Sequence, residues 1–178
     1  WRAVPEMQAS NRGQGLVMHM LQDFSKLVVG GETPLLRVWD LARERCVQTY
    51  QSGTNSSVSC LCSMKAGEIN TALAGCSDGS IRVLDLRANQ PSRLTEHSTY
   101  VVNVAMLNGS LGSESQMISA ASNGEIKIWD LRTMSSIKTF RAHKERITAM
   151  ALHPYAPVLA AGSDAQMVNV ISTGGEVL

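Results

Sequence analysis

A few histidine, glutamate and cysteine side chains could do chemistry by type and spacing. His143 stands close in sequence to Glu145 and His153, an arrangement that could support acid–base catalysis if the fold gathered the three side chains. A histidine at the start of a short apolar strand is more often structural. We therefore expect no catalytic role for this group.

The second group is a cysteine pair. Cys60 and Cys62 are two residues apart on one expected strand, so their side chains share a face, as two zinc ligands could. A zinc site needs two further well-spaced ligands, and the histidines come from unrelated connections. We favour free thiols buried as small apolar residues. Unpaired cysteines predict a reducing, cytoplasmic compartment.

The sequence has no G-x-S-x-G elbow, no phosphate-binding glycine loop and no H-E-x-x-H motif. We predict that the chain is not an enzyme and uses no catalytic residue, cofactor or metal.

Sixteen lysines and arginines against fifteen aspartates and glutamates leave a net charge of +1. Such a balance gives no field to attract nucleic acid. No apolar run is long enough to enter and span a membrane. The partners we expect are proteins.

The elements that would position these side chains recur at a fixed interval. Residues 116–132 (QMISAASNGEIKIWDLR) contain two apolar runs, a tight polar turn and a closing Trp-Asp pair. Similar stretches begin at Lys26 and Thr71, and a weaker one begins at Pro157. The aspartates that close the first three, Asp40, Asp85 and Asp130, are 45 residues apart. Several short strands per unit at this interval are typical of β-propeller blades.

We therefore predict an all-β propeller, with about four blades present. The blades are expected at residues 15–50, 58–95, 100–140 and 146–178, the last incomplete, after an outer strand of a preceding blade and a linker in residues 1–14. The chain is read as part of a longer one. An open stack of blades leaves sheet faces uncovered. We expect the isolated segment to be marginally stable or to associate.

Turn and strand composition add two local predictions. Asp78-Gly79 and Asn123-Gly124 predict two-residue hairpins in which both central residues have positive φ. The second strand of each blade is built from small residues, including Gly30 and Gly75. Such residues should let neighbouring blades approach closely and leave room for the tryptophans.

With Trp-Asp, an Asx-Gly turn and an upstream histidine, the units resemble WD repeats. The resemblance implies a ring of seven blades, so about four of an expected seven are present. In that family a histidine hydrogen-bonds towards the turn aspartate and, through a hydroxyl on the second strand, towards the tryptophan. The resemblance implies a structural network of His97, Ser119 or Ser122, Asn123, Trp129 and Asp130 in the third blade, with Trp39, Asp40, Asp78, His143 and Asp164 in the others. In the fourth blade, one extra residue in the third strand would place Ile171 and Ser172 at the Trp and Asp positions.

A closer resemblance covers nearly the whole chain. Residues 147–163 (ITAMALHPYAPVLAAGS), the ending GGEVL, the stretch SDGSIRVLDLR and the opening WRAVP are similar to the C-terminal propeller of the Raptor family, scaffold subunits of target-of-rapamycin complex one. The resemblance implies a regulatory scaffold that binds a target-of-rapamycin kinase and helps to present substrates in nutrient and growth signalling. It also implies a cytoplasmic protein that is recruited to the lysosome or vacuole surface.

One alternative comes from a different functional class. Trp129-Asp130-Leu131-Arg132 resembles the WD-x-R box with which substrate receptors of cullin-type ubiquitin ligases dock their adaptor, although Asn123 stands where that box has aspartate. Arg132 would carry this interaction.

Loop positions near strand starts and turns are the expected interaction surface on propeller geometry alone: Ser57, Ser77, Tyr100, Ser122, Lys144 and Arg146. The basic connection at residues 140–146 is either a docking patch for an acidic partner or phosphopeptide or, as we favour, a solvated loop.

Overall fold

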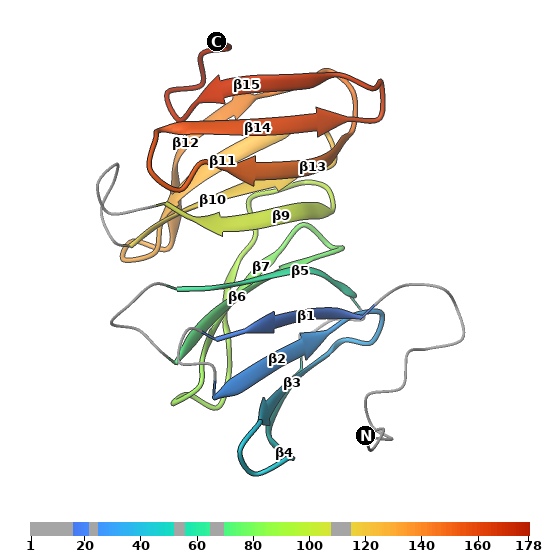
Figure 1. Ribbon diagram of the computed structural model, residues 1–178, viewed down its shortest axis with the longest axis vertical. Helices are drawn as coiled ribbons and strands as arrows, with labels where there is room; N and C mark the ends of the chain where they lie inside the picture. Colours follow the sequence, from blue (N-terminus) through green and yellow to red (C-terminus); the bar gives the residue numbers. More distant parts are fainter. Residues whose placement is uncertain (1–15, 22–24, 52–55, 65–69, 108–114) are drawn as a thin grey trace.

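The computed structural model describes residues 16–21, 25–51, 56–64, 70–107 and 115–178. Within these ranges the chain forms strands and turns, and no helix there could cross a membrane. Four antiparallel sheets follow one another in chain order, stacked along the long axis of the molecule (Figure 1). This arrangement is a β-propeller fragment and confirms the predicted fold class. The sheets are called blades one to four below. Residues 1–14, expected to form an outer strand and a linker, lie outside the described residues.

The strands have the following bounds. Blade one contains β1 (Val17–Met20), β2 (Lys26–Gly30), β3 (Leu35–Asp40) and β4 (Arg45–Gln51). Blade two contains β5 (Val58–Ser63), β6 (Thr71–Cys76), β7 (Ile81–Asp85) and the short β8 (Ser92–Leu94). Blade three contains β9 (Val101–Met106), β10 (Gln116–Ala121), β11 (Glu125–Asp130) and β12 (Ser135–Arg141). Blade four contains β13 (Ile147–Leu152), β14 (Val158–Ser163) and β15 (Val168–Ser172).

Each blade is an up-and-down meander, because short loops join strands that are neighbours in sequence. The first strands form a continuous row, with β1 beside β5, β5 beside β9 and β9 beside β13. The last strands lie at the opposite edge of their sheets. Blade four has three strands, and a single bridge from Ile171 to Val177 marks the place of a fourth. The first strands of all four repeats therefore lie along one edge of the stack.

The core lies between successive blades. Its three clusters of buried apolar side chains each join two neighbouring sheets, through residues such as Val28 and Val58, Leu73 and Val101, and Ile118 and Ile147. The small second-strand residues permit this packing. A Cβ added to Gly30 would lie 2.9 Å from Val58 Cβ, and one added to Gly75 would lie 2.7 Å from Val101 Cγ1. The expected close approach of the blades is confirmed.

The hairpin turns differ from the prediction. Gly79 and Gly124 have φ of +81° and +89°, but Asp78 and Asn123 do not have positive φ. The Gly79 N–H donates to the carbonyl of Cys76 and the Gly124 N–H to that of Ala121 (both 3.2 Å), so each loop has three residues and the last of them is the left-handed glycine. The prediction of two positive-φ residues was wrong, because the extra residue preceding the Asx belongs to the loop rather than to the strand.

Candidate interaction site

Blade three contains a buried polar network built on one hydroxyl. Trp129 Nε1 donates to Ser119 Oγ (2.7 Å), and His97 Nε2 lies 2.7 Å from the same oxygen. The two rings meet edge to face, with centroids 5.8 Å apart. Ser119 comes from β10, Trp129 from β11 and His97 from the connection before β9. Of the two serines considered for this role, Ser119 makes the contacts and Ser122 does not.

The carboxylate of Glu125 lies on the outer side of His97. Glu125 Oε2 lies 3.7 Å from His97 Nδ1, too far for a hydrogen bond, and its other oxygen pairs with Lys127 Nζ at 3.0 Å. Burial lowers the pKa of His97 to about 4, against the attraction of Glu125, because a buried imidazolium loses its hydration. Asn123 Oδ1 accepts a hydrogen bond from the Glu125 amide (3.1 Å). Sequence reasoning missed Glu125, although its place two residues after the turn Asx was visible.

Blade one keeps the tryptophan but lacks this network. Trp39 is buried, and its Nε1 has no hydrogen-bond partner within the described part of the chain. Asp40 accepts a hydrogen bond from the Arg43 amide (3.0 Å), so it caps the turn after β3. The pairing of the second and third strands shows why the Trp39 indole has no partner. Ser119 pairs with Lys127 in blade three, and Val29 pairs with Arg37 at the matching place in blade one.

Blades two and four use other contacts. Asp78 accepts from the Ser80 amide (3.0 Å) and from Arg93 Nη2 (2.9 Å), which closes the turn onto the outer strand. His143 Nε2 donates to the carbonyl of Ala161 (2.7 Å), because Ala161 occupies the Ser119 position and offers no hydroxyl. Both side chains therefore make contacts within the fold.

The assignment of Asp164 to the turn Asx position was wrong. Gln166 has φ of +61° and its N–H donates to Ser163, so Gln166 matches Gly79 and Gly124. Asp164 then matches Ser77 and Ser122, and Ala165 stands at the Asx position. The same offset places Ile171 at the tryptophan position without any extra residue in β15. The missing glycine in this turn caused the misalignment.

The two Asp-Arg pairs close turns at the other end of the blades. Arg132 folds back on Asp130, with its own amide 2.9 Å and its Nη2 3.2 Å from the carboxylate oxygens. Arg87 and Asp85 repeat this arrangement, with the Arg87 amide 2.9 Å and its Nη2 3.0 Å from the carboxylate oxygens. These hydrogen bonds lower the pKa values of Asp85 and Asp130. The guanidinium of Arg132 is thus engaged within its own turn while two-thirds of its side chain is exposed.

The groups considered for catalysis and zinc binding are dispersed. His143 precedes β13 and His153 follows it, so they stand at opposite ends of a six-residue strand, roughly 20 Å long. His153 Nδ1 accepts from the amides of Tyr155 (3.1 Å) and Ala156 (2.8 Å). The four cysteines are free, and burial raises the pKa of Cys60 to about 12. The described residues contain no group of three potential metal ligands.

A recess of about 650 Å³ lies where the first strands of the blades begin. Its lining includes Leu16, Ser57, Ser59, Ser77, Tyr100 and Arg146, and we call it the mouth pocket. Four of these residues were predicted at the interaction surface: Ser57, Ser77, Tyr100 and Arg146. The structure thus brings together residues that are up to 89 positions apart in the sequence.

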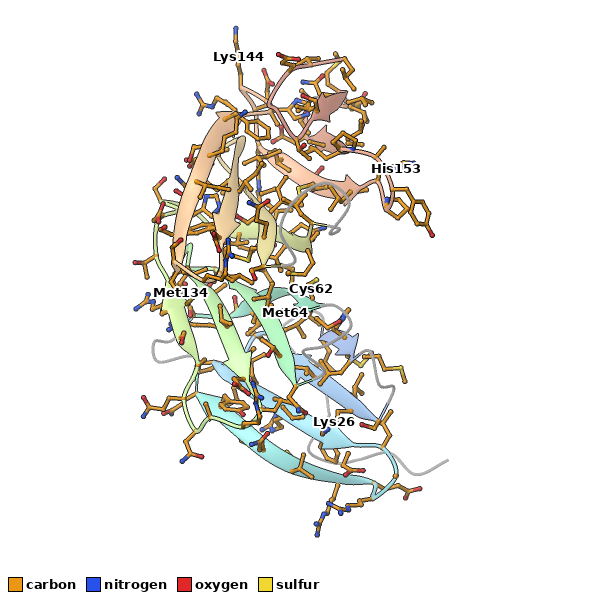
Figure 2. The ribbon with its side chains drawn as sticks, turned by 90° about the vertical axis from the view of Figure 1, so that its left-hand side faces the viewer. Lys26, Cys62, Met64, Met134, Lys144 and His153 are labelled. Carbon is orange, nitrogen blue, oxygen red and sulfur yellow. The ribbon has the colours of Figure 1, made fainter. Side chains whose placement is uncertain are left out.

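The other two predicted surface residues lie elsewhere. Ser122 follows β10 and its amide donates to the Tyr100 carbonyl (2.9 Å), but it does not line the mouth pocket. Lys144 lines a separate recess of about 520 Å³ together with Arg141, His143 and Met167. Figure 2 shows Lys144 pointing away from the body of blade four, far from His153.

Comparison with known proteins gives consistent matches. The WD domain, G-beta repeat family matches residues 44–85 and 134–172. Target of rapamycin complex 1 subunit mip1 of Schizosaccharomyces pombe is 33% identical over 180 residues, which cover 99% of this chain and 13% of that protein. The Protein raptor homolog of Dictyostelium discoideum is 36% identical over 185 residues, which cover 99% of this chain and 12% of that protein.

The match extends to three dimensions. The crystal structure of Chaetomium thermophilum Raptor superposes with a TM-score of 0.83 at 30% identity, over 95% of this chain and 16% of that one. The chain therefore corresponds to a small part of these much longer relatives, 13% and 12% of the two curated ones.

Proposed function

Because this chain belongs to the WD-repeat part of the Raptor family, we propose that it is a non-catalytic interaction scaffold within a regulatory subunit of target of rapamycin complex 1. In this role it helps to bind the kinase complex and to present substrates in growth and nutrient signalling. The observation that carries the proposal is the identity of 33–36% with two such proteins over 99% of the chain.

The physical properties of the fold support such a role. A rigid stack of sheets holds many loops in fixed positions, so contact residues can vary without disturbing the core. Ser77, Ser122 and Asp164 illustrate this, because each amide donates at 2.9–3.0 Å to the carbonyl of the residue just before the first strand. The side chains before those strands are thereby presented on a fixed backbone.

The proposal is tested by affinity purification of the complete tagged protein from cells, followed by identification of the captured proteins. We expect the target-of-rapamycin kinase among them in stoichiometric amount. A protein that enriches a cullin adaptor instead, and loses it on Arg132→Ala, would be a ubiquitin-ligase receptor, and the scaffold proposal would then be wrong.

We also propose that the protein works in the cytoplasm, as its free thiols support. Fluorescence imaging of the tagged complete protein should show cytoplasmic signal that gathers at the lysosome or vacuole when nutrients are restored. A signal confined to the secretory pathway would contradict this.

A further inference from the structure

The mouth pocket is formed by equivalent positions of four repeats. Leu16, Ser57, Tyr100 and Arg146 each stand immediately before the first strand of their blade, and all four line the recess. Three of the repeats share a backbone contact at this point, because the carbonyls of Ser57, Tyr100 and Arg146 accept the same turn hydrogen bond. All four differ in side chain: one is aliphatic, one a small hydroxyl, one aromatic and one cationic. The side chains at this position therefore differ although the position in the blade is the same. Such variation indicates that packing does not determine which side chain stands there.

The charged and polar groups of the pocket are mostly free to bind a ligand. Arg146 is exposed, and its guanidinium has no ion pair or hydrogen bond among the described residues. Ser77 Oγ accepts from the Ser57 amide (3.0 Å), so its proton can still be donated. Ser59 is different, because its hydroxyl already bonds the carbonyls of Gly75 and Val101.

Among the described residues no carboxylate lines the pocket, so the unused groups that they contribute are hydroxyls and a guanidinium around one aliphatic wall. Hydrogen-bond donors around one arginine suit an anion, and a guanidinium can hold a carboxylate by two parallel hydrogen bonds. A single positive charge matches a carboxylate, whereas sites for phosphorylated peptides usually gather several arginines. Leu16, at 39% exposure, offers a surface for the methylene groups of a glutamate side chain.

We propose that the mouth pocket binds a glutamate side chain of an extended peptide segment in a partner protein. The carboxylate pairs with Arg146, the hydroxyls of Ser77 and Tyr100 donate to its remaining lone pairs, and Leu16 packs against the methylene groups. This assignment rests on the proposed scaffold function, and it adds the surface and the ligand class.

The test uses the complete protein and an array of extended nine-residue peptides. The peptides share one neutral frame and differ at the central position, which is glutamate, glutamine or phosphoserine. We expect glutamate peptides to bind best, and we expect Arg146→Gln to weaken their binding by about 10-fold or more, as loss of a paired charge does. Tyr100→Phe should cost about 3-fold, and Arg146→Lys should recover part of the affinity.

Two further variants separate the pocket from general charge. Lys138→Gln removes an exposed cation from the outermost strand β12 and should leave peptide binding unchanged. Lys144→Gln removes a cation outside the pocket and should have a much smaller effect than Arg146→Gln. Equal losses in the Lys144 and Arg146 variants, preference for phosphoserine, or no difference between glutamate and glutamine would each overturn the assignment.

Capture of the kinase complex is measured on the same variants. If the Arg146→Gln protein still captures the complex while the wild-type protein ignores glutamate peptides, the pocket assignment fails and the scaffold function stands. If the wild-type protein captures no kinase complex but binds glutamate peptides through Arg146, the scaffold proposal fails and the pocket remains.

Discussion

Blades one and three each have a tryptophan at the equivalent position of their sheet, but the indole N–H groups differ in hydrogen bonding. Trp129 Nε1 donates to Ser119 Oγ at 2.7 Å, whereas Trp39 Nε1 is buried without a partner in the described residues. Both sheets nevertheless share one architecture. Each has a register shift immediately before its tryptophan, between Val38 and Trp39 in one and between Ile128 and Trp129 in the other.

The comparison shows that the polar network is not required for the sheet. The register among the second, third and fourth strands is the same with it and without it, so the alternation of apolar residues and the packing between blades suffice to set that register. The network instead satisfies buried groups that would otherwise cost free energy. It adds stability to blade three and makes that stability sensitive to single substitutions.

The largest expected effect comes from Ser119→Ala. This change removes the one oxygen that both Trp129 Nε1 and His97 Nε2 contact, so two buried groups lose their partner. We expect the free energy of unfolding to fall by about 2–6 kcal/mol, at about 1–3 kcal/mol for each of the two orphaned groups. Urea denaturation of the chain measures this. Ser122→Ala is the matched control and should change stability by less than about 0.5 kcal/mol. Equal effects in the two variants would mean that the network does not stabilise blade three.

A second test uses pH, because blade three places a titratable ring beside its indole. The pKa of His97 is about 4 when folded and 6.5 in the unfolded chain. Between these values the unfolded chain binds a proton that the folded chain does not, so stability falls as the pH drops from 6.5 to about 4. The total loss is about 3 kcal/mol, at 1.36 kcal/mol per unit.

His97→Gln should remove this part of the pH dependence. Asp85 and Asp130, whose pKa values are lowered, contribute equally to both proteins. Glu96 and Glu125 also have lowered pKa values and interact with His97, so the difference between the two urea-stability curves reports His97 together with its coupling to these two glutamates. Parallel curves over this pH range would show that the ring is not held neutral by burial.

The smallest expected effect is a repair of blade one. Val29→Ser places a hydroxyl where blade three has Ser119, so it should accept a hydrogen bond from Trp39 Nε1. The gain offsets the lost burial of the valine, and we expect stability within about 1 kcal/mol of the parent. Val28→Ser, on the opposite face of β2, has no such partner and should cost about 2–4 kcal/mol. Equal losses in the two variants would contradict the equivalence of Val29 and Ser119.

The fold could be predicted because it depends on features that are local and repeated. The 45-residue interval, the short apolar runs and the small residues at Gly30 and Gly75 each have a direct counterpart in the sheets. Turn type was mispredicted because the Asx-Gly signal does not reveal whether the preceding serine pairs across the hairpin. Asp164 was misplaced for a related reason, since Gln166 adopts the left-handed conformation that usually marks a glycine.

The site could be predicted only in part. Ser57, Ser77, Tyr100 and Arg146 follow from the rule that strand starts meet at one edge of a propeller. That rule could not exclude Lys144, which stands two residues earlier and faces another recess. Glu125 beside His97 depends on a contact between a connection and the next blade's third strand, a distance that no spacing in the sequence encodes.

One face of blade four carries apolar side chains, as a sheet interior does, but these side chains are exposed. Val168 is 68% exposed and Val170 43%, on the side of β15 away from blade three. Apolar side chains that face water favour any contact that covers them, whether with a further blade or with a second copy. By mass action, a chain that self-associates through this face gains apparent stability as it is concentrated, so its melting temperature becomes a property of the solution as well as of the fold.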